Sequence, residues 1–174
     1  MIFTKTSCLI LGLVFFLLIA FKVSAASDYF LPYPSFMPGH KLYFLERIIE
    51  GFSRYWAFGN FARHRYELKM ADKKLVEVKT LFEYQQYLLG TKALSESNQH
   101  FQKASLYLIK AEAEGKDISQ KLANYQLAGS KHQEVLKGLK KELPEDFLWQ
   151  PENQEATRLN LAGLIEEAIK IREI

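Results

Sequence analysis

The chain has 174 residues, of which 48% are hydrophobic and 25% charged, and its formal net charge at pH 7 is +3. This length suits one domain that buries its core without disulfide or metal cross-links. A charge so close to balance argues against a nucleic-acid-binding protein, which would carry a marked basic excess. The only cysteine, Cys8, lies in the N-terminal leader, so the rest of the chain has no disulfide, cysteine nucleophile or thiolate metal ligand.

Residues 1–25 have the three parts of a secretory signal peptide. Lys5 supplies the basic region, an apolar run of 14 residues extends from Cys8 to Phe21, and Val23-Ser24-Ala25 matches a cleavage site. A membrane-spanning helix needs about 20 apolar residues, so this run is too short for one. We predict cleavage after Ala25 and an exported protein that is periplasmic, secreted or associated with the outer side of the membrane. The alternative is an uncleaved leader that anchors the same domain.

Residues 26–39 contain three prolines and a glycine, so we expect an extended lead-in rather than a helix. From residue 40, apolar side chains recur at alternating steps of three and four, which predicts a first helix of about four turns. Residues 29–61 hold eleven aromatic residues. We expect this aromatic segment to plug one end of the core, because aromatic side chains bury large areas. The alternative is a surface for a partner or a membrane. The stripe positions of the first helix are Leu42, Leu45, Ile49, Phe52 and Trp56.

Three longer helices are predicted in the remainder of the bundle, which we assign to residues 40–143. One extends from about residue 61 to 89 and ends at Gly90, the next ends at Gly115, and the last extends from about residue 118 to Leu143. Apolar residues spaced by three and four are typical of antiparallel helices packed at shallow angles in a left-handed supercoil. The stripe positions include Leu68, Ala71, Leu75, Val78 and Phe82, then Leu94, Ser97, Phe101, Ala104 and Leu108, and finally Tyr125, Gly129, His132, Leu136 and Leu139.

Residues 144–174 are predicted to form a connector and a C-terminal helix. Helices tolerate proline in their first turn, so we place the start of the fifth helix at Pro151. Its apolar residues make a broad face, which includes Leu161 and Ile165, and which packs against its own bundle or another chain. No alternating β-branched run indicates a strand. The predicted fold is all-α, an antiparallel bundle of about four to five helices with heptad-type packing.

No motif in the sequence identifies an enzyme, since phosphate-binding loops, a nucleophile elbow and Glu-x-x-His pairs are missing. Glu96 and His100 have the wrong spacing for such a pair, and we expect both to face solvent. His64 and His132 lie on the apolar stripes and are candidate metal ligands, since imidazole commonly binds metals. We expect instead that each completes the core with one hydrogen bond. We therefore predict no enzymatic activity, no catalytic residue and no cofactor.

The second predicted helix is locally basic. Such a strip can attract anionic lipid headgroups or cell-wall polymers. Acidic residues are interleaved at three- and four-residue spacing, which supports ion pairs along the helix and weakens the field. We expect a solvated face, and electrostatic binding is the alternative. The basic residues are Arg63, Arg65, Lys69, Lys73, Lys74 and Lys79.

A resemblance to a known family rests on the strings Leu31-Pro32, Pro38-Gly39-His40-Lys41-Leu42-Tyr43-Phe44-Leu45-Glu46-Arg47 and Ala71-Asp72-Lys73-Lys74-Leu75-Val76-Glu77. Over about residues 31–140 the chain resembles domain of unknown function 5667, a family of exported bacterial proteins. Position 46 is Glu where the family usually has lysine, and position 74 is Lys where arginine is common. The resemblance implies a helical protein that is secreted or attached to the bacterial envelope, and it implies no activity.

We expect a non-enzymatic exported envelope protein that acts as a helical protein-interaction or structural module. Its partner is expected to be another protein or a second copy, with peripheral contact to a membrane surface or cell wall as a further option, and no nucleic acid. The alternative function is a periplasmic bundle that binds a metal or a small ligand through His64 and His132. The candidate interaction residues are Tyr33, Phe36, Tyr43, Trp56, Trp149, Leu161 and Ile165.

Overall fold

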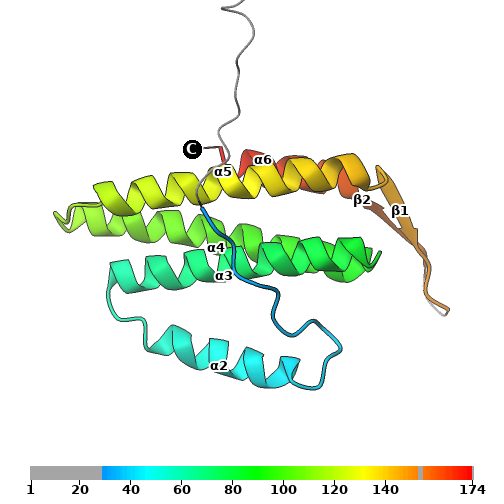
Figure 1. The fold of residues 1–174 in the computed structure, drawn as a ribbon, viewed down its shortest axis with the longest axis horizontal. Helices are drawn as coiled ribbons and strands as arrows, with labels where there is room; N and C mark the ends of the chain where they lie inside the picture. Colours follow the sequence, from blue (N-terminus) through cyan, green and yellow to red (C-terminus); the bar gives the residue numbers. More distant parts are fainter. Residues whose placement is uncertain (1–28, 153–154, 174) are drawn as a thin grey trace, which may run out of the picture.

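A computed structural model describes residues 29–152 and 155–173, so the predicted signal peptide lies outside the described residues. Helices α3, α4 and α5 lie side by side, α6 runs along α5, and α2 lies outside α3 (Figure 1). This arrangement confirms the predicted all-α antiparallel bundle. The elements in chain order are α2 (Tyr43–Tyr55), α3 (Asn60–Glu83), α4 (Tyr87–Ala113), α5 (Ser119–Glu142), β1 (Asp146–Trp149), β2 (Thr157–Asn160) and α6 (Leu161–Lys170).

The core lies between α3, α4, α5 and α6 and uses the stripes that the sequence predicts. One cluster gathers Leu75, Leu94 and Leu136, each at most 2% exposed, together with residues of α6. A second cluster is centred on Phe101, whose ring stacks on Tyr125 with centroids 4.5 Å apart. The spacing by three and four turns these faces inward because one helical turn contains 3.6 residues.

The boundary between the second and third helices lies earlier in the chain than predicted. The first, α3, ends at Glu83, and Gln85 then takes a left-handed φ of 58° before α4 begins. Gly90 was expected to end the helix, but it lies inside α4. There it allows close packing of Phe82, because a Cβ at position 90 would lie 2.2 Å from a ring carbon. The apolar period continues across the turn, and for that reason it could not locate the reversal of the chain.

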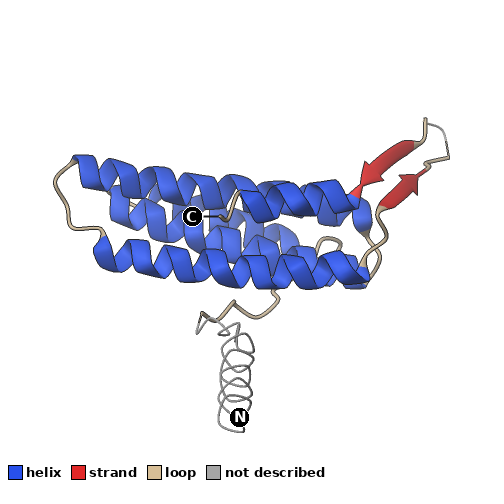
Figure 2. Ribbon diagram, turned by 90° about the horizontal axis from the view of Figure 1, so that it is seen from above, coloured by secondary structure: helices blue, strands red, loops and turns tan. Residues whose placement is uncertain are grey.

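A two-stranded antiparallel hairpin replaces the start of the predicted fifth helix, so the prediction of no strand and of a helix from Pro151 was wrong. Strands β1 and β2 pair from Asp146 opposite Asn160 to Trp149 opposite Thr157, and the hairpin projects from one end of the bundle (Figure 2). The Asn160 side chain accepts a hydrogen bond from the backbone N–H of Gly163 at 2.8 Å and so caps α6. That cap fixes the helix start ten residues later than predicted.

The apolar face of α6 packs against its own bundle. Leu161, Ile165 and Ala168 are fully buried, and the last two belong to the cluster around Leu136. Leu161 and Ile165 are therefore core residues, and their assignment to an interaction surface was wrong. Within residues 29–152 and 155–173, no helix is both long enough and apolar enough to cross a membrane.

Candidate functional site

Helix α2 is amphipathic, and its polar side faces the bundle. Nζ of Lys73 on α3 pairs with Glu46 at 2.6 Å and also with Glu50. The hydroxyl of Tyr66 donates a hydrogen bond to the backbone carbonyl of Glu50 at 3.1 Å. Helix α2 is therefore held on α3 by ion pairs and hydrogen bonds rather than by a shared apolar core.

A buried ion cluster extends this contact into the bundle. Lys74 is 1% exposed, and its Nζ donates to Glu77 at 2.8 Å and to Glu96 at 2.9 Å. Burial lowers the pKa of Lys74, but the two carboxylates outweigh this effect and raise the pKa above its ordinary value. The hydroxyl of Tyr43 on α2 donates to Glu77 at 3.3 Å. The first turn of α2 is thus tied to a permanently charged group of α3.

The expectation that Glu96 and His100 face solvent was wrong. Besides its bond to Lys74, Glu96 lies 3.5 Å from Arg47 of α2. The Nδ1 atom of His100 lies 2.5 Å from a carboxylate oxygen of the buried Glu67. Both residues therefore belong to the polar contacts between helices, which helix periodicity alone does not reveal.

The opposite side of α2 is apolar and faces solvent, and no residue of α2 is buried. The four aromatic side chains on this side expose roughly 600 Å² between them, as large as the largest apolar patch of a typical monomer. The expectation that the aromatic segment plugs the core was therefore wrong, and these side chains form a surface. We call this surface the α2 apolar face; its residues, 37–79% exposed, are Phe44, Leu45, Ile48, Ile49, Phe52, Tyr55 and Trp56.

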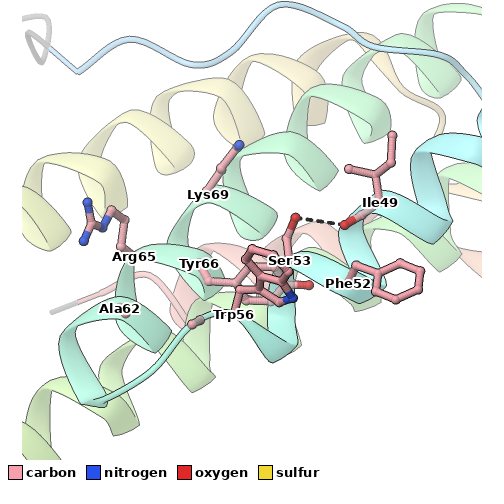
Figure 3. Close-up of a pocket in the computed structure, with 9 residues that line it drawn as sticks. Ile49, Phe52, Ser53, Trp56, Ala62, Arg65, Tyr66 and Lys69 are labelled. Atoms are coloured by element: carbon pink, nitrogen blue, oxygen red, sulfur yellow. Dashed lines mark hydrogen bonds between the residues drawn. The ribbon is translucent and has the colours of Figure 1, made fainter.

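A groove of about 480 Å³ separates α2 from α3 beside this face (Figure 3). Phe52 and Trp56 line it from α2, and Arg65 and Lys69 line it from α3. Tyr66 of α3, whose hydroxyl donates to the Glu50 carbonyl of α2, also lines it. The groove therefore combines an apolar wall with a cationic one.

Four cations surround the C-terminal end of α2, and we call them the basic collar: Arg54, Arg63, Arg65 and Lys69. Two of them line the groove, and the other two line a second hollow on the far side of Tyr66. In the described part of the chain, none of the four forms an ion pair. The basic strip predicted for this helix is thus divided, because Lys73 and Lys74 turn inward to carboxylates while the collar stays in solvent.

A second polar cluster is buried at the centre of the bundle, around His132. The Nε–H of Arg172 donates to His132 Nδ1 at 2.9 Å, so the ring proton sits on Nε2, which donates to Asp72 at 2.7 Å. The second oxygen of Asp72 accepts a hydrogen bond from the Tyr29 hydroxyl at 2.6 Å. Burial lowers the pKa of His132, although Asp72 opposes the effect, and His132 is neutral.

Arg172 completes this buried network and is 1% exposed. Its guanidinium donates to Ser97 Oγ at 2.9 Å, to Asn98 Oδ1 at 2.6 Å and to the Ala168 carbonyl at 2.8 Å. Burial lowers the pKa of Arg172 to about 10, which leaves it charged at neutral pH. The sequence signal for this network was that Ser97, His132 and Arg172 are polar residues at stripe spacing, the last continuing the series 161, 165 and 168.

The structure brings no metal site together from His64 and His132. Nδ1 of His64 lies 3.0 Å from the Ala104 carbonyl, and burial lowers the pKa of His64. Both ring nitrogens of His132 are already hydrogen-bonded. Across residues 29–152 and 155–173, no group of three or more His, Cys, Asp or Glu side chains could hold a metal ion.

The remaining candidate interaction residues lie at different places. Tyr33 and Trp56 are strongly exposed, whereas Phe36 stacks on the ring of His40 with centroids 4.7 Å apart. Tyr43 is partly buried by its bond to Glu77, and Trp149 is partly buried in β1. Of these residues, only Trp56 belongs to the α2 apolar face.

Comparison with known proteins identifies one family. Its model, described as Domain of unknown function (DUF5667), matches residues 35–146, which is more than half of the chain. No curated protein and no solved structure matches the chain. The matched segment contains α2 to α5, and with them the α2 apolar face and the Asp72–His132 bond, but not Arg172. The chain belongs to the DUF5667 family, which confirms the resemblance seen in its sequence.

Proposed function

We propose that the protein is a non-enzymatic exported module that docks onto another surface outside the cytoplasm through the α2 apolar face. One observation carries this proposal, which is that an amphipathic helix is fastened by its polar side and presents its apolar side to solvent. Burying half of the roughly 600 Å² of aromatic surface would contribute about 7 kcal/mol before the costs of association. A binding partner would recover that free energy.

The helices α3 to α6 serve, in this proposal, as the scaffold that holds α2 in place. Asp72, His132 and Ser97 are residue types of acid–base and nucleophilic catalysis, but all three are buried. The Ser97 hydroxyl donates to the Ala71 carbonyl at 2.9 Å and accepts from Arg172, so it is not poised as a nucleophile. These contacts support a structural role for the cluster and a non-enzymatic function.

Site-specific photocrosslinking tests the proposal in the cells that make the protein. Phe52 is replaced by the photoreactive amino acid p-benzoylphenylalanine, and in a matched control the same replacement is made at Leu127, an exposed residue of α5. We expect an adduct with a protein, a second copy or a lipid from position 52 and none from position 127. Failure of position 52 to give any adduct, or equal yields at both positions, would overturn the proposed docking function.

A further inference from the structure

We infer that the α2 apolar face docks onto an anionic lipid surface, with the face in the lipid and the basic collar on the headgroups. This inference rests on the proposed docking function and names its partner. The described residues supply two independent arguments, one from charge and one from shape.

Charge complementarity selects an anionic partner. The basic collar places Arg54 and Arg63 on one side of the end of α2, and Arg65 and Lys69 on the other. The acidic residues of α2 do not offset these cations, because Glu46 and Glu50 are already paired with Lys73 on the inward side. Four cations beside an exposed apolar helix match the attraction of basic residues to anionic headgroups.

The shape and composition of the face favour a lipid layer over a folded protein. Helix α2 is the outermost helix on its side of the bundle and forms a ridge, so a soft, flat layer can surround it along its length (Figure 1). Helices that lie in a membrane interface carry Trp, Phe and Leu on the buried side and Lys or Arg beside them. Trp56 and Tyr55 lie at the end nearest the collar, and such rings favour the headgroup level.

The groove between α2 and α3 provides a place for one lipid. Its wall of Ile49, Phe52 and Trp56 suits an acyl chain, and Arg65 and Lys69, which line the groove from α3, supply the positive charge for a lipid phosphate (Figure 3). Docked in this way, α2 lies parallel to the membrane, and α5 and α6 stay in solvent on the far side of α3 (Figure 1).

Vesicle co-sedimentation of the purified protein tests the inference. The probes are vesicles of phosphatidylcholine alone and of phosphatidylcholine with about 30% phosphatidylglycerol, which supplies the anionic charge. We expect the protein to pellet with the anionic vesicles and to be released when the salt concentration is raised, since salt screens the collar. Replacing Phe52 and Trp56 together by Glu should abolish pelleting, whereas Leu127→Glu on α5 should leave it unchanged.

The collar is tested by its own pair of variants. Each basic residue near an anionic surface contributes about fivefold in affinity, so Arg65→Gln with Lys69→Gln should weaken binding about 25-fold. The matched control, Lys137→Gln with Lys141→Gln, removes the same charge from exposed positions on α5 and should change binding little. Circular dichroism melts of every variant separate loss of binding from loss of fold.

The outcomes distinguish this inference from the proposed function. If position 52 crosslinks to a protein or to a second copy and the protein does not pellet with anionic vesicles, the lipid inference fails and the docking function stands. Equal pelleting with both vesicle types would also overturn the lipid inference. So would equal effects of the collar variant, Arg65→Gln with Lys69→Gln, and its control, Lys137→Gln with Lys141→Gln. If neither adducts nor pelleting occur, the docking function fails as well.

Discussion

Substitution of Asp72 by Asn removes the one carboxylate of the buried network and changes little in its shape. Asp72 accepts from Tyr29 and from His132, and through the imidazole ring it faces the buried cation Arg172. An Asn side chain can still accept from His132 through its oxygen and donate to the Tyr29 hydroxyl through its nitrogen. The substitution therefore tests the charge more than the hydrogen bonds.

We expect Asp72→Asn to lower the unfolding free energy by about 3 kcal/mol. Leaving one member of a buried ion pair without its partner costs about 3 to 5 kcal/mol. The lower end applies here because Arg172 keeps its bonds to Ser97, Asn98 and the Ala168 carbonyl, and its guanidinium lies 5.1 Å from the Phe101 ring centroid. For a domain of this size the loss corresponds to a fall in melting temperature of about 9 °C.

Urea denaturation followed by circular dichroism at neutral pH measures this difference. The control is Asp146→Asn, because Asp146 forms a direct ion pair with Arg158 but both side chains are exposed, and little change is expected. A loss below about 1 kcal/mol for Asp72→Asn, or an equal loss for both variants, would refute the reasoning. It would mean that the carboxylate contributes nothing beyond its hydrogen bonds.

Two further predictions concern the interior. The unfolding free energy should fall as the pH drops below about 6.5, by at most about 1.4 kcal/mol per pH unit for each histidine, because His64 and His132 have lowered pKa values when folded and bind protons more readily when unfolded. Urea curves at about pH 7.5 and 5.5 check this slope, and identical curves would contradict it. Gly90→Ala should destabilise by about 2 kcal/mol, since the clash with Phe82 exceeds the gain in helix propensity, whereas Gly138→Ala, which meets nothing within 4 Å, should stabilise by up to about 1 kcal/mol. Thermal melts of the two glycine variants that shift in the same direction would refute that argument.

Helix periodicity predicted most of the bundle because the stripes of α3, α4 and α5 are buried along their full length. The same period failed for α2, where Phe52 and Trp56 repeat as regularly as core residues yet face solvent. Periodicity shows that a helix has an apolar side. Whether that side or the polar side faces the protein depends on the contacts that the polar side can make with a neighbouring helix. For α2, the contacts with Lys73 and Lys74 of α3 turn its polar side toward the bundle. Such contacts between helices cannot be inferred from the periodicity of one helix.

The hairpin could not be predicted for a different reason. Strands β1 and β2 have only four residues each, which is too few to show an alternating pattern. Pro151 suits the first turn of a helix equally well, although it lies in the connection between the strands. The Asn160 cap was the better signal for the helix start, since Asn is favoured at that position.

The candidate site was predictable in part. Trp56 was chosen from its aromatic surroundings and does lie on the exposed face, whereas Leu161 and Ile165 were chosen from a pattern that a core helix shares. The arginine and lysine of the groove appeared in the sequence as members of one basic strip. That these two face solvent, whereas Lys73 and Lys74 turn inward, could be seen only once the position of α2 was known.

The buried network also determines the order in which the core can pack as the protein folds. The network joins three parts of the chain, with Asp72 on α3, His132 on α5 and Arg172 after α6. These residues therefore emerge one after another as the chain is synthesised. Until Arg172 is in place, Asp72 and His132 lack one hydrogen-bonding partner and remain hydrated. The helices around them can exclude water only after Arg172 has joined the network. The segment that follows α6 is therefore the closing element of the core.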